Sequence, residues 1–360
     1  MMAVAAAGCD RGAQPKIQNP KADESQEEHV AHCNPVFSLF DIDGHGTYHV
    51  YRNGEKAASL TLGDGRVPVG MCTHNGDCYI LVSESHKKSP NRDTDTTSAG
   101  TPPPAADSPK WSPAEIYKNG RRAMVLDDRL HAISFDMDEG HFYVLGKLGD
   151  SVYTVYRDGQ RVINYPARQD GEAVDMAVFQ QSVYVARQRG KTIDVYNGDK
   201  KLYSLAGKCR DLKVSLRGVY VLVDDSLYLD RSVIMHDEYY RKADKELYAK
   251  PTMIAVSEKN VLVGGRAAFD KKHTYACIFQ NQQAYATIKP DSKNIGESDL
   301  STRCCGVAVS DETMYYATTI LSPDMKQESP SAYYIHTDHS ESYVIKFEDS
   351  DATLLMMASD

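Results

Sequence analysis

Several features that would point to common protein classes are missing from this chain of 360 residues. It contains one tryptophan and no run of about 18 or more apolar residues, the length that a membrane-spanning helix requires. Its 50 acidic residues outnumber its 41 basic ones, so it lacks the basic excess with which proteins bind nucleic acid. Long amphipathic helical patterns are scarce, and no Gly-x-Ser-x-Gly segment marks a serine nucleophile. These absences leave a folded chain that is rich in strand-forming residues.

Cysteine is present, but its number and spacing do not indicate a complete disulfide framework. There are eight cysteines, and lipidation of Cys9 would leave an odd number. Cys72 and Cys78 flank a hairpin turn and form a candidate disulfide, with two reduced thiols as the alternative. The neighbouring Cys304 and Cys305 are expected to be reduced, because free cysteine packs as a small apolar residue. The spacing does not match a zinc site, and we expect neither a metal nor a cofactor.

One short hairpin signal recurs along the chain. A β-branched residue, a tyrosine and then Asn-Gly or Asp-Gly occur within residues 50–54, 116–120, 155–159 and 195–198. Asn and Gly adopt positive φ at low cost, so these pairs fit the tight turn between twisted antiparallel strands. Asn119, Asp158 and Asn197 follow one another at steps of 39 residues. Self-similarity at such a period is typical of propellers and solenoids.

Four short strands fit into each repeat, and the first of them, the innermost, is small and apolar. Six repeats have innermost strands expected at 68–75, 131–137, 173–179, 211–216, 252–257 and 304–309. Residues 352–357 form one further innermost strand, for which 36–42, 48–52 and 56–62 supply the other three. The sequence therefore predicts an all-β fold. We expect a seven-bladed β-propeller with four-stranded antiparallel blades, whose closing blade is shared by the N- and C-termini.

This repeat anatomy resembles that of seven-bladed β-propellers, specifically the divergent kind found in bacterial exported lipoproteins. The resemblance covers about residues 34–360 and rests on the repeats alone. The Gly-His and Trp-Asp pairs of WD40 repeats and the paired glycines of kelch repeats are absent. A two-domain sandwich is the main alternative fold.

Residues 1–33 are expected to form a separate N-terminal segment. Ala6-Ala7-Gly8-Cys9 resembles a lipobox, in which small residues precede the cysteine that carries the lipid. The basic start of a signal peptide is missing, and an ordinary alanine-rich start is the alternative. The polar residues 10–28 suit a flexible tether. The resemblance implies a monomer at the cell envelope, in the periplasm or on the outer-membrane surface, whose only membrane contact is a lipid on Cys9.

The two faces of the expected ring differ. Turns that join the first strand to the second, and the third to the fourth, are short and share one face, which we call the tight-turn face. The opposite, long-loop face carries the longer connections, among them an insertion at about 87–110 that we expect to be disordered and the charged segment 237–250, a candidate helix. Long loops on a rigid scaffold commonly carry function. We therefore expect a ligand site on the long-loop face, near the central channel.

The candidate ligand-binding residues are mostly basic residues near the starts of innermost strands. Arginine forks at the mouth of a channel suit carboxylate, sulfate or phosphate groups. The favoured alternative is that these arginines pair with loop carboxylates such as Asp127, Asp128 or Asp211. The candidates are Arg66, Arg129, His131, Asp175, Arg210, Arg303 and Trp111, the last lying out of phase with the repeat.

These observations favour a non-catalytic binding or scaffold propeller that engages a protein or a glycan on its long-loop face. The alternative is a hydrolase or lyase that acts on an anionic carbohydrate in the channel, which needs paired carboxylates there. The innermost strands offer Asp136, Asp138 and Asp175, although the first two are expected near the tight-turn face. The Asp-box of sialidases and the Trp-rich repeats of quinone-cofactor dehydrogenases are both absent.

Overall fold

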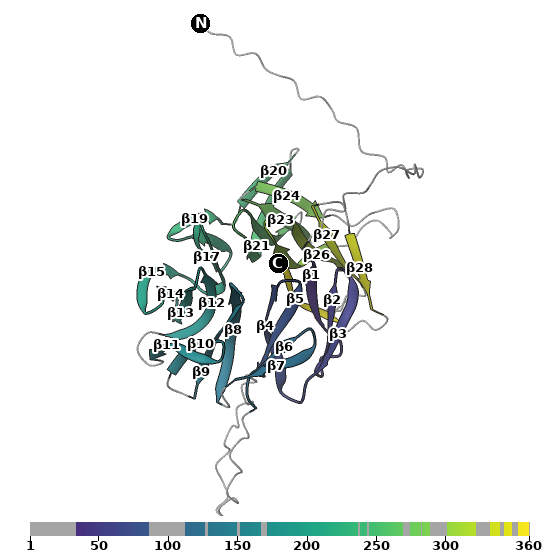
Figure 1. Cartoon of the computed structure of the whole chain (residues 1–360). Helices are drawn as coiled ribbons and strands as arrows, with labels where there is room; N and C mark the ends of the chain where they lie inside the picture. Colours follow the sequence, from purple (N-terminus) through teal and green to yellow (C-terminus); the bar gives the residue numbers. More distant parts are fainter. Residues whose placement is uncertain are drawn as a thin grey trace, which may run out of the picture. The chain divides into compact units, whose positions relative to one another are not determined.

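A computed structural model of the chain describes residues 34–85, 112–126, 129–149, 152–166, 171–236, 238–242, 245–268, 274–281, 283–288, 301–321, 332–338, 342–347 and 352–359. These residues form seven antiparallel sheets that are arranged as the blades of a ring (Figure 1). The described residues contain strands and turns but no helix. The prediction of an all-β, seven-bladed propeller is confirmed.

Blades 1 to 4 are meanders of four consecutive strands, which run from the innermost strand outward. Blade 1 contains β4 (Arg66–His74), β5 (Asp77–Glu84), β6 (Glu115–Lys118) and β7 (Arg121–Val125). Blade 2 contains β8 (Leu130–Asp138), β9 (His141–Leu148), β10 (Val152–Arg157) and β11 (Gln160–Pro166). Blade 3 contains β12 (Glu172–Phe179), β13 (Ser182–Arg189), β14 (Thr192–Asn197) and β15 (Lys200–Ala206). Blade 4 contains β16 (Cys209–Ser215), β17 (Gly218–Val223), β18 (Ser226–Leu229) and β19 (Ser232–Met235).

The remaining blades include one with an additional strand and one that joins the chain ends. Blade 5 contains β20 (Glu238–Lys242), β21 (Lys245–Val256), β22 (Val261–Ala268), β23 (Thr274–Gln280) and β24 (Gln283–Ile288). Blade 6 contains β25 (Ser301–Val309), β26 (Met314–Leu321), β27 (Ala332–Thr337) and β28 (Ser342–Lys346). Blade 7 contains the C-terminal β29 (Thr353–Ser359), followed by β1 (Val36–Asp41), β2 (Thr47–Arg52) and β3 (Glu55–Thr61). Contacts between β29 and β4 close the ring.

The prediction of a helix within residues 237–250 is wrong. The described part of this segment is strand β20 and the start of β21, which pair in antiparallel register from Glu238 with Ala249 to Lys242 with Lys245. The charges suggested a solvated helical face. The segment instead forms β20 and the first part of β21, which is the innermost strand of blade 5. Strand β21 pairs with β20 on one side and with β22 on the other, so these ladders satisfy its main-chain donors and acceptors.

The recurring hairpin signal corresponds to a bulge followed by a tight turn. In blades 7, 1, 2 and 3 the ladder between the third and fourth strands shifts register directly before the repeated tyrosine, as between Val50 and Tyr51. Asn53 then has φ +49° and Gly54 φ +81°, the backbone that the sequence pattern demands. A Cβ on Gly54 would come within 2.7 Å of Tyr343 Cβ in blade 6. The turn therefore also allows the two blades to approach closely.

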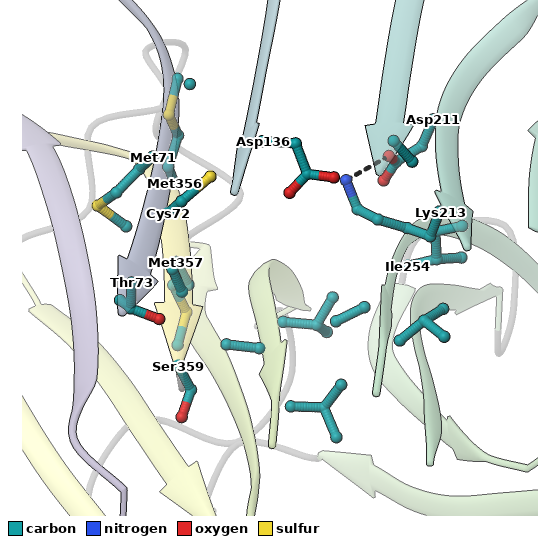
Figure 2. Close-up of a pocket in the computed structure, with 18 of the residues that line it drawn as sticks. Met71, Cys72, Thr73, Asp136, Asp211, Lys213, Ile254, Met356, Met357 and Ser359 are labelled. Carbon is teal, nitrogen blue, oxygen red and sulfur yellow. Dashed lines mark ion pairs between the residues drawn. The ribbon is translucent and has the colours of Figure 1, made fainter. Parts of the chain in front are cut away.

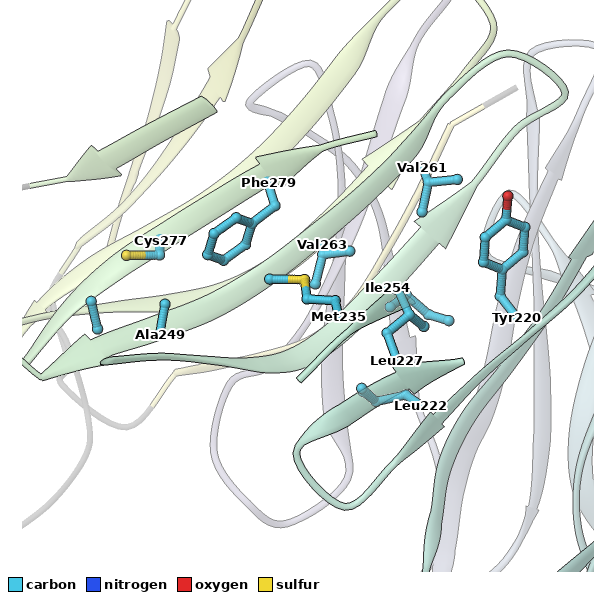
Figure 3. Close-up of a cluster of buried hydrophobic side chains, with 11 residues drawn as sticks. Tyr220, Leu222, Leu227, Met235, Ala249, Ile254, Val261, Val263, Cys277 and Phe279 are labelled. Carbon is cyan, nitrogen blue, oxygen red and sulfur yellow. The ribbon is translucent and has the colours of Figure 1, made fainter. Parts of the chain in front are cut away.

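Apolar layers between neighbouring blades hold the ring together. Between blades 4 and 5, Tyr220, Leu222 and Met235 pack against Ile254 and Phe279, and all five are at most 3% exposed (Figure 3). Burial of one such side chain stabilises a fold by roughly 1.5–3 kcal/mol. The repeated tyrosines at 51, 117, 156 and 196 lie in or beside such buried positions, in agreement with a packing role.

Candidate functional site in the central channel

The innermost strands β4, β8, β12, β16, β21, β25 and β29 surround a channel. A cavity of about 1020 Å³ lies there, and every one of these strands contributes residues to its lining. Ligand sites in proteins commonly have volumes of roughly 300–1,000 Å³. The channel is therefore large enough for a small molecule or for the end of an extended chain.

Each innermost strand carries a β-bulge at the same place in its blade. The pairing of the strand with its neighbour skips one residue, in turn Val69, Ile133, Val174, Arg210, Thr252, Cys305 and Leu355. A bulge releases one residue from the ladder and redirects its side chain. Arg210 is the charged member of this set, and it lines the cavity. We call this ring of seven residues the bulge level.

Three residues farther along each strand, the channel is lined mainly by alanine. This level consists of Cys72, Asp136, Ala177, Lys213, Ala255, Ala308 and Ala358. Small side chains leave room near the axis of the ring. Asp136 on β8 and Lys213 on β16 point toward each other across this space (Figure 2). The strand between them, β12, contributes only the methyl group of Ala177 at this level.

Lys213 lies among three carboxylates from consecutive blades. Its Nζ is 3.0 Å from Asp211 Oδ1, and Asp175 and Asp136 also attract its charge. Asp175 and Asp211 occupy equivalent places, directly after the bulges of β12 and β16. The Lys213 side chain is 42% exposed, so water in the channel reaches an ammonium that protein surrounds on all sides.

The same carboxylates connect neighbouring blades. Val178 N on β12 donates to Asp136 Oδ2 on β8 at 2.7 Å, and Leu212 N on β16 donates to Asp175 Oδ2 on β12 at 2.8 Å. Ser134 Oγ donates to the other oxygen of Asp175 at 2.7 Å. One edge of β12 and of β16 faces the channel side of the neighbouring blade and has no ladder partner. The carboxylates satisfy main-chain donors on this edge, which gives them a structural role.

The protein environment shifts the proton affinities of this cluster. Burial raises the pKa of Asp136 and of Asp175 to about 6, although Lys213 and the main-chain donors counteract the effect. Burial alone would lower the pKa of Lys213, but the three carboxylates hold it above its ordinary value. Burial and the nearby Asp136 raise the pKa of the Cys72 thiol well above its usual range. At neutral pH the cluster therefore combines one ammonium with mainly ionised carboxylates.

The opposite wall of the channel is apolar and rich in sulfur. Met253 and Ile254 from β21 and Met356 and Met357 from β29 line the cavity, and Met71 from β4 lies beside Met356 (Figure 2). Thioether side chains are flexible and adapt to irregular apolar surfaces. Along its middle, the channel thus offers a charged wall on blades 2 to 4 and an apolar wall on blades 5 to 7 and 1, and Glu258 and Asp311 add carboxylates to the second wall at the tight-turn end.

The predicted ligand residues occupy different environments. Asp175 and Arg210 line the cavity. Arg66 is turned away from it and pairs with Glu115 at 2.7 Å, with only 15% of its side chain exposed. This pairing corresponds to the structural alternative for the arginines, although Glu115 lies on strand β6 and not in a loop.

The other predicted residues are not brought together. Arg129 immediately precedes β8, His131 lies in β8 with a partly buried side chain, and Arg303 is exposed on β25. These three described residues do not contribute to the cavity lining. Trp111 and Cys9 lie outside the described residues, as do the segment 1–33 and the insertion at 87–110.

The candidate disulfide between Cys72 and Cys78 is not formed. Both cysteines are reduced. Thr73 is the direct cross-strand partner of Cys78, so Cys72 projects from the other side of the sheet. Cys72 accordingly packs in the layer between blades 1 and 2, whereas Cys78 is buried in the layer shared with blade 7. Cys304 and Cys305 are also reduced, as expected.

Sequence reasoning missed Asp136, Asp211 and Lys213 as members of one site. Asp136 lies in the half of β8 nearer the tight turn, where the strand register predicts it, and its side chain lines the cavity. The period of the hairpin signal does not reveal the site, because Asp136 lies three residues after the bulge of its strand and Asp175 only one residue after the bulge of the next blade. The sequence of each innermost strand also has no pattern that distinguishes a strand with a bulge from a regular strand.

Comparisons with known proteins add distant likenesses only. No protein-family model and no curated protein matches the sequence. BBS1N in complex with ARL6DN is 10% identical, with 90% of this chain and 92% of that chain covered at a TM-score of 0.46. The dihydro-heme d1 dehydrogenase NirN in complex with DHE is 10% identical, with coverage of 94% and 77% and a TM-score of 0.45. Apo AztD from Citrobacter koseri is 9% identical, with coverage of 91% and 98% and a TM-score of 0.42.

These likenesses are too weak to carry an argument about ligand or reaction, so the fold rests on the strand order of the seven sheets. Among the described residues, no helix is long and apolar enough to cross a membrane. The same part of the chain contains no group of three or more His, Cys, Asp or Glu residues that would hold a metal ion.

Proposed function

We propose that this protein is a non-catalytic binding propeller that takes the end of a glycan or of a protein chain into its central channel from the long-loop face. The observation that carries the proposal is the cavity of about 1020 Å³ with one charged and one apolar wall. A sugar ring or an extended peptide presents polar groups and apolar surface together, and such ligands suit a two-sided site. The volume favours the end of a chain over a folded domain.

Binding is favoured over catalysis because the channel carboxylates are engaged with the main chain. Asp136 and Asp175 accept hydrogen bonds from the next blade through one oxygen each, and Met137 N and Met176 N donate to the other oxygen. A general acid or base needs an oxygen directed at the substrate. These carboxylates are instead part of the connection between blades.

One observation supports the alternative of a hydrolase or lyase. The raised pKa values of Asp136 and Asp175, about 6, lie in the range of general acids in enzymes. Asp175→Asn distinguishes the two functions, because the amide oxygen retains an acceptor while proton transfer is lost. Under the binding proposal this variant captures a glycan without change in the length of the glycan, and neither it nor the native chain releases shorter products.

The proposal includes export and anchoring. A lipid on Cys9 would hold the propeller at the cell envelope as a monomer, with the preceding Ala6-Ala7-Gly8 as the recognition sequence. Metabolic labelling of the full-length chain with a radioactive fatty acid tests this part. Label that disappears in Cys9→Ala supports anchoring, and label that persists in this variant, or none in the native chain, contradicts it.

Channel binding is tested with bulky substitutions at two depths of one strand. Val69 belongs to the bulge level of β4, and Thr73 lies four residues nearer the tight-turn end. A ligand captured on an array of glycans and peptides is expected to bind Val69→Trp at least about 10-fold more weakly, a loss of roughly 1.4 kcal/mol. Thr73→Trp should weaken binding less, because the ligand enters from the other end.

Matched controls carry the same changes on outer strands. Val162→Trp on β11 and Thr61→Trp on β3 replace exposed residues and should leave binding unchanged. Thermal unfolding verifies that all four variants are folded. Equal binding by Val69→Trp and the native chain would show that the channel is not the site. Failure of the native chain to retain any member of the array would remove the binding function itself.

A further inference from the structure

Basic residues from three strands converge at the long-loop mouth of the channel, between blades 4 and 5. Arg210 Nη2 lies 3.6 Å from Asp225 Oδ1, and Lys250 Nζ lies 2.9 Å from Asp225 Oδ2. Arg266 on β22 also acts on the charge of Asp225. Asp225 lies in the turn from β17 to β18, which belongs to the long-loop face. Arg210 and Lys250 thus share one carboxylate, and Arg266 lies near enough to act on its charge.

The arrangement places like charges opposite each other. Lys250 and Arg266 are direct cross-strand partners in the ladder between β21 and β22, and like charges in such positions destabilise a sheet. Asp225 compensates one of the three positive charges. The neighbouring Asp224 and Lys208, whose main chains are joined by a hydrogen bond of 2.9 Å, contribute charges of opposite sign. Among these described side chains, the basic residues therefore outnumber the acidic ones.

These side chains are accessible to a ligand. The side chains of Arg210, Lys250 and Asp225 are 47%, 36% and 38% exposed. Arg266 is exposed as well. An ion pair between groups this exposed contributes about 0–1 kcal/mol, because water screens the charges. An incoming anion can therefore share the cations without breaking a strong internal interaction. Arg210 also lines the channel, which connects this cluster to the cavity.

We propose that Arg210, Lys250 and Arg266 form an anion-binding subsite at the mouth of the channel, which takes a carboxylate, sulfate or phosphate group of the ligand. The subsite deepens the proposed function and rests on it, because it specifies which glycans or chain ends the channel accepts. Two guanidinium groups offer paired N–H donors that match the oxygens of such groups. Lys250 adds a point charge from the opposite strand. The ligand class is thus acidic.

The test uses small anions, which reach the subsite whether or not the channel binds a larger ligand. Equilibrium dialysis of the full chain against radiolabelled inorganic phosphate, sulfate and glucuronate, at constant ionic strength, should reveal one saturable site. The three arms determine which anionic group is preferred. Arg266→Gln and Arg210→Gln should each lower the affinity for the preferred anion at least about 10-fold, whereas Arg266→Lys should retain most of this affinity.

Arg121→Gln is the matched control, since Arg121 is an exposed arginine on the outer strand β7. The proposal is overturned if the native chain has no saturable site, if Arg266→Gln binds as the native chain does, or if Arg121→Gln weakens binding equally. The last result would indicate general surface charge. Val69→Trp separates the two proposals: loss of glycan or peptide capture with retained anion binding supports both, and unchanged capture contradicts the channel function alone.

Discussion

The partly buried carboxylates of the channel make a specific prediction about how stability depends on pH. The pKa of Asp136 and of Asp175 rises from 3.8 to about 6 on folding. A carboxyl group whose pKa is higher in the folded state holds its proton more tightly there, so its ionisation costs stability as the pH rises from about 4 to about 6. Asp175→Asn and Asp136→Asn remove this titration. Relative to the native chain, each variant should therefore become more stable as the pH increases.

The expected size follows from the shift. One pKa unit corresponds to about 1.4 kcal/mol, so the full shift of one carboxyl group corresponds to about 3 kcal/mol. Between pH 4.5 and pH 7, about 2 kcal/mol of this should be observed, since the carboxyl group is already partly ionised in the unfolded state at pH 4.5. His49 and His336 have pKa values that burial lowers. The contribution of these histidines to the free energy of unfolding rises with pH. It is the same in the native chain and in the variants, so it cancels when the variants are compared with the native chain.

Urea unfolding followed by far-UV circular dichroism at pH 4.5, 5.5, 6.2 and 7 measures the effect through the midpoint and slope of each transition. Asp43→Asn is the control, because hydrogen bonds from Thr47 and His45 lower the pKa of Asp43 to about 2. The contribution of Asp43 is present above about pH 4 and is flat across this window. A difference between Asp175→Asn and the native chain that stays constant or falls with pH would refute the reasoning.

Two further predictions concern the framework. Glu115→Ala leaves the guanidinium of Arg66 without its buried carboxylate, and urea unfolding should show that the free energy of unfolding falls by about 3–5 kcal/mol. Arg122 is the control, because its side chain is 63% exposed, and Arg122→Ala should lower this free energy by less than about 1 kcal/mol. Equal losses in the two variants would contradict a buried ion pair. Deletion of residues 353–360 removes β29, so the chain should bind a hydrophobic dye and elute as larger species in size-exclusion chromatography; an unchanged melting temperature and elution volume would show that closure by β29 is dispensable.

The strand order was predictable because turn chemistry acts locally. Asn119-Gly120 and Asp158-Gly159 require positive φ whatever surrounds them, and both pairs have it. Once these turns fix the third strand of each blade, the remaining strands follow from the length of the repeat. The segment 352–357 could be assigned to blade 7 for the same reason, since the repeat leaves one innermost strand missing at the N-terminus.

The site was less predictable because it depends on how strands align between blades. Arg66 and Arg210 occupy similar positions in sequence, just before the expected innermost strands, yet Arg66 pairs with Glu115 away from the cavity and Arg210 lines it. The difference arises from their places relative to the bulge that both strands carry, because Arg210 is the bulge residue of β16 whereas Arg66 lies three residues before the bulge at Val69 of β4. A hydrophobicity pattern does not contain the place of the bulge. The convergence of Lys213 with carboxylates from two other blades likewise needs the closed ring.

Closure of the ring by blade 7 has a consequence for how the molecule can be attached to other structures. β1 is the second strand of its blade and β29 the first, so β1 begins and β29 ends at the tight-turn face. Both covalent exits of the propeller therefore lie on the same rim, opposite the cluster around Asp225. A tether, a fused domain or an immobilisation tag at either end leaves the channel mouth unobstructed.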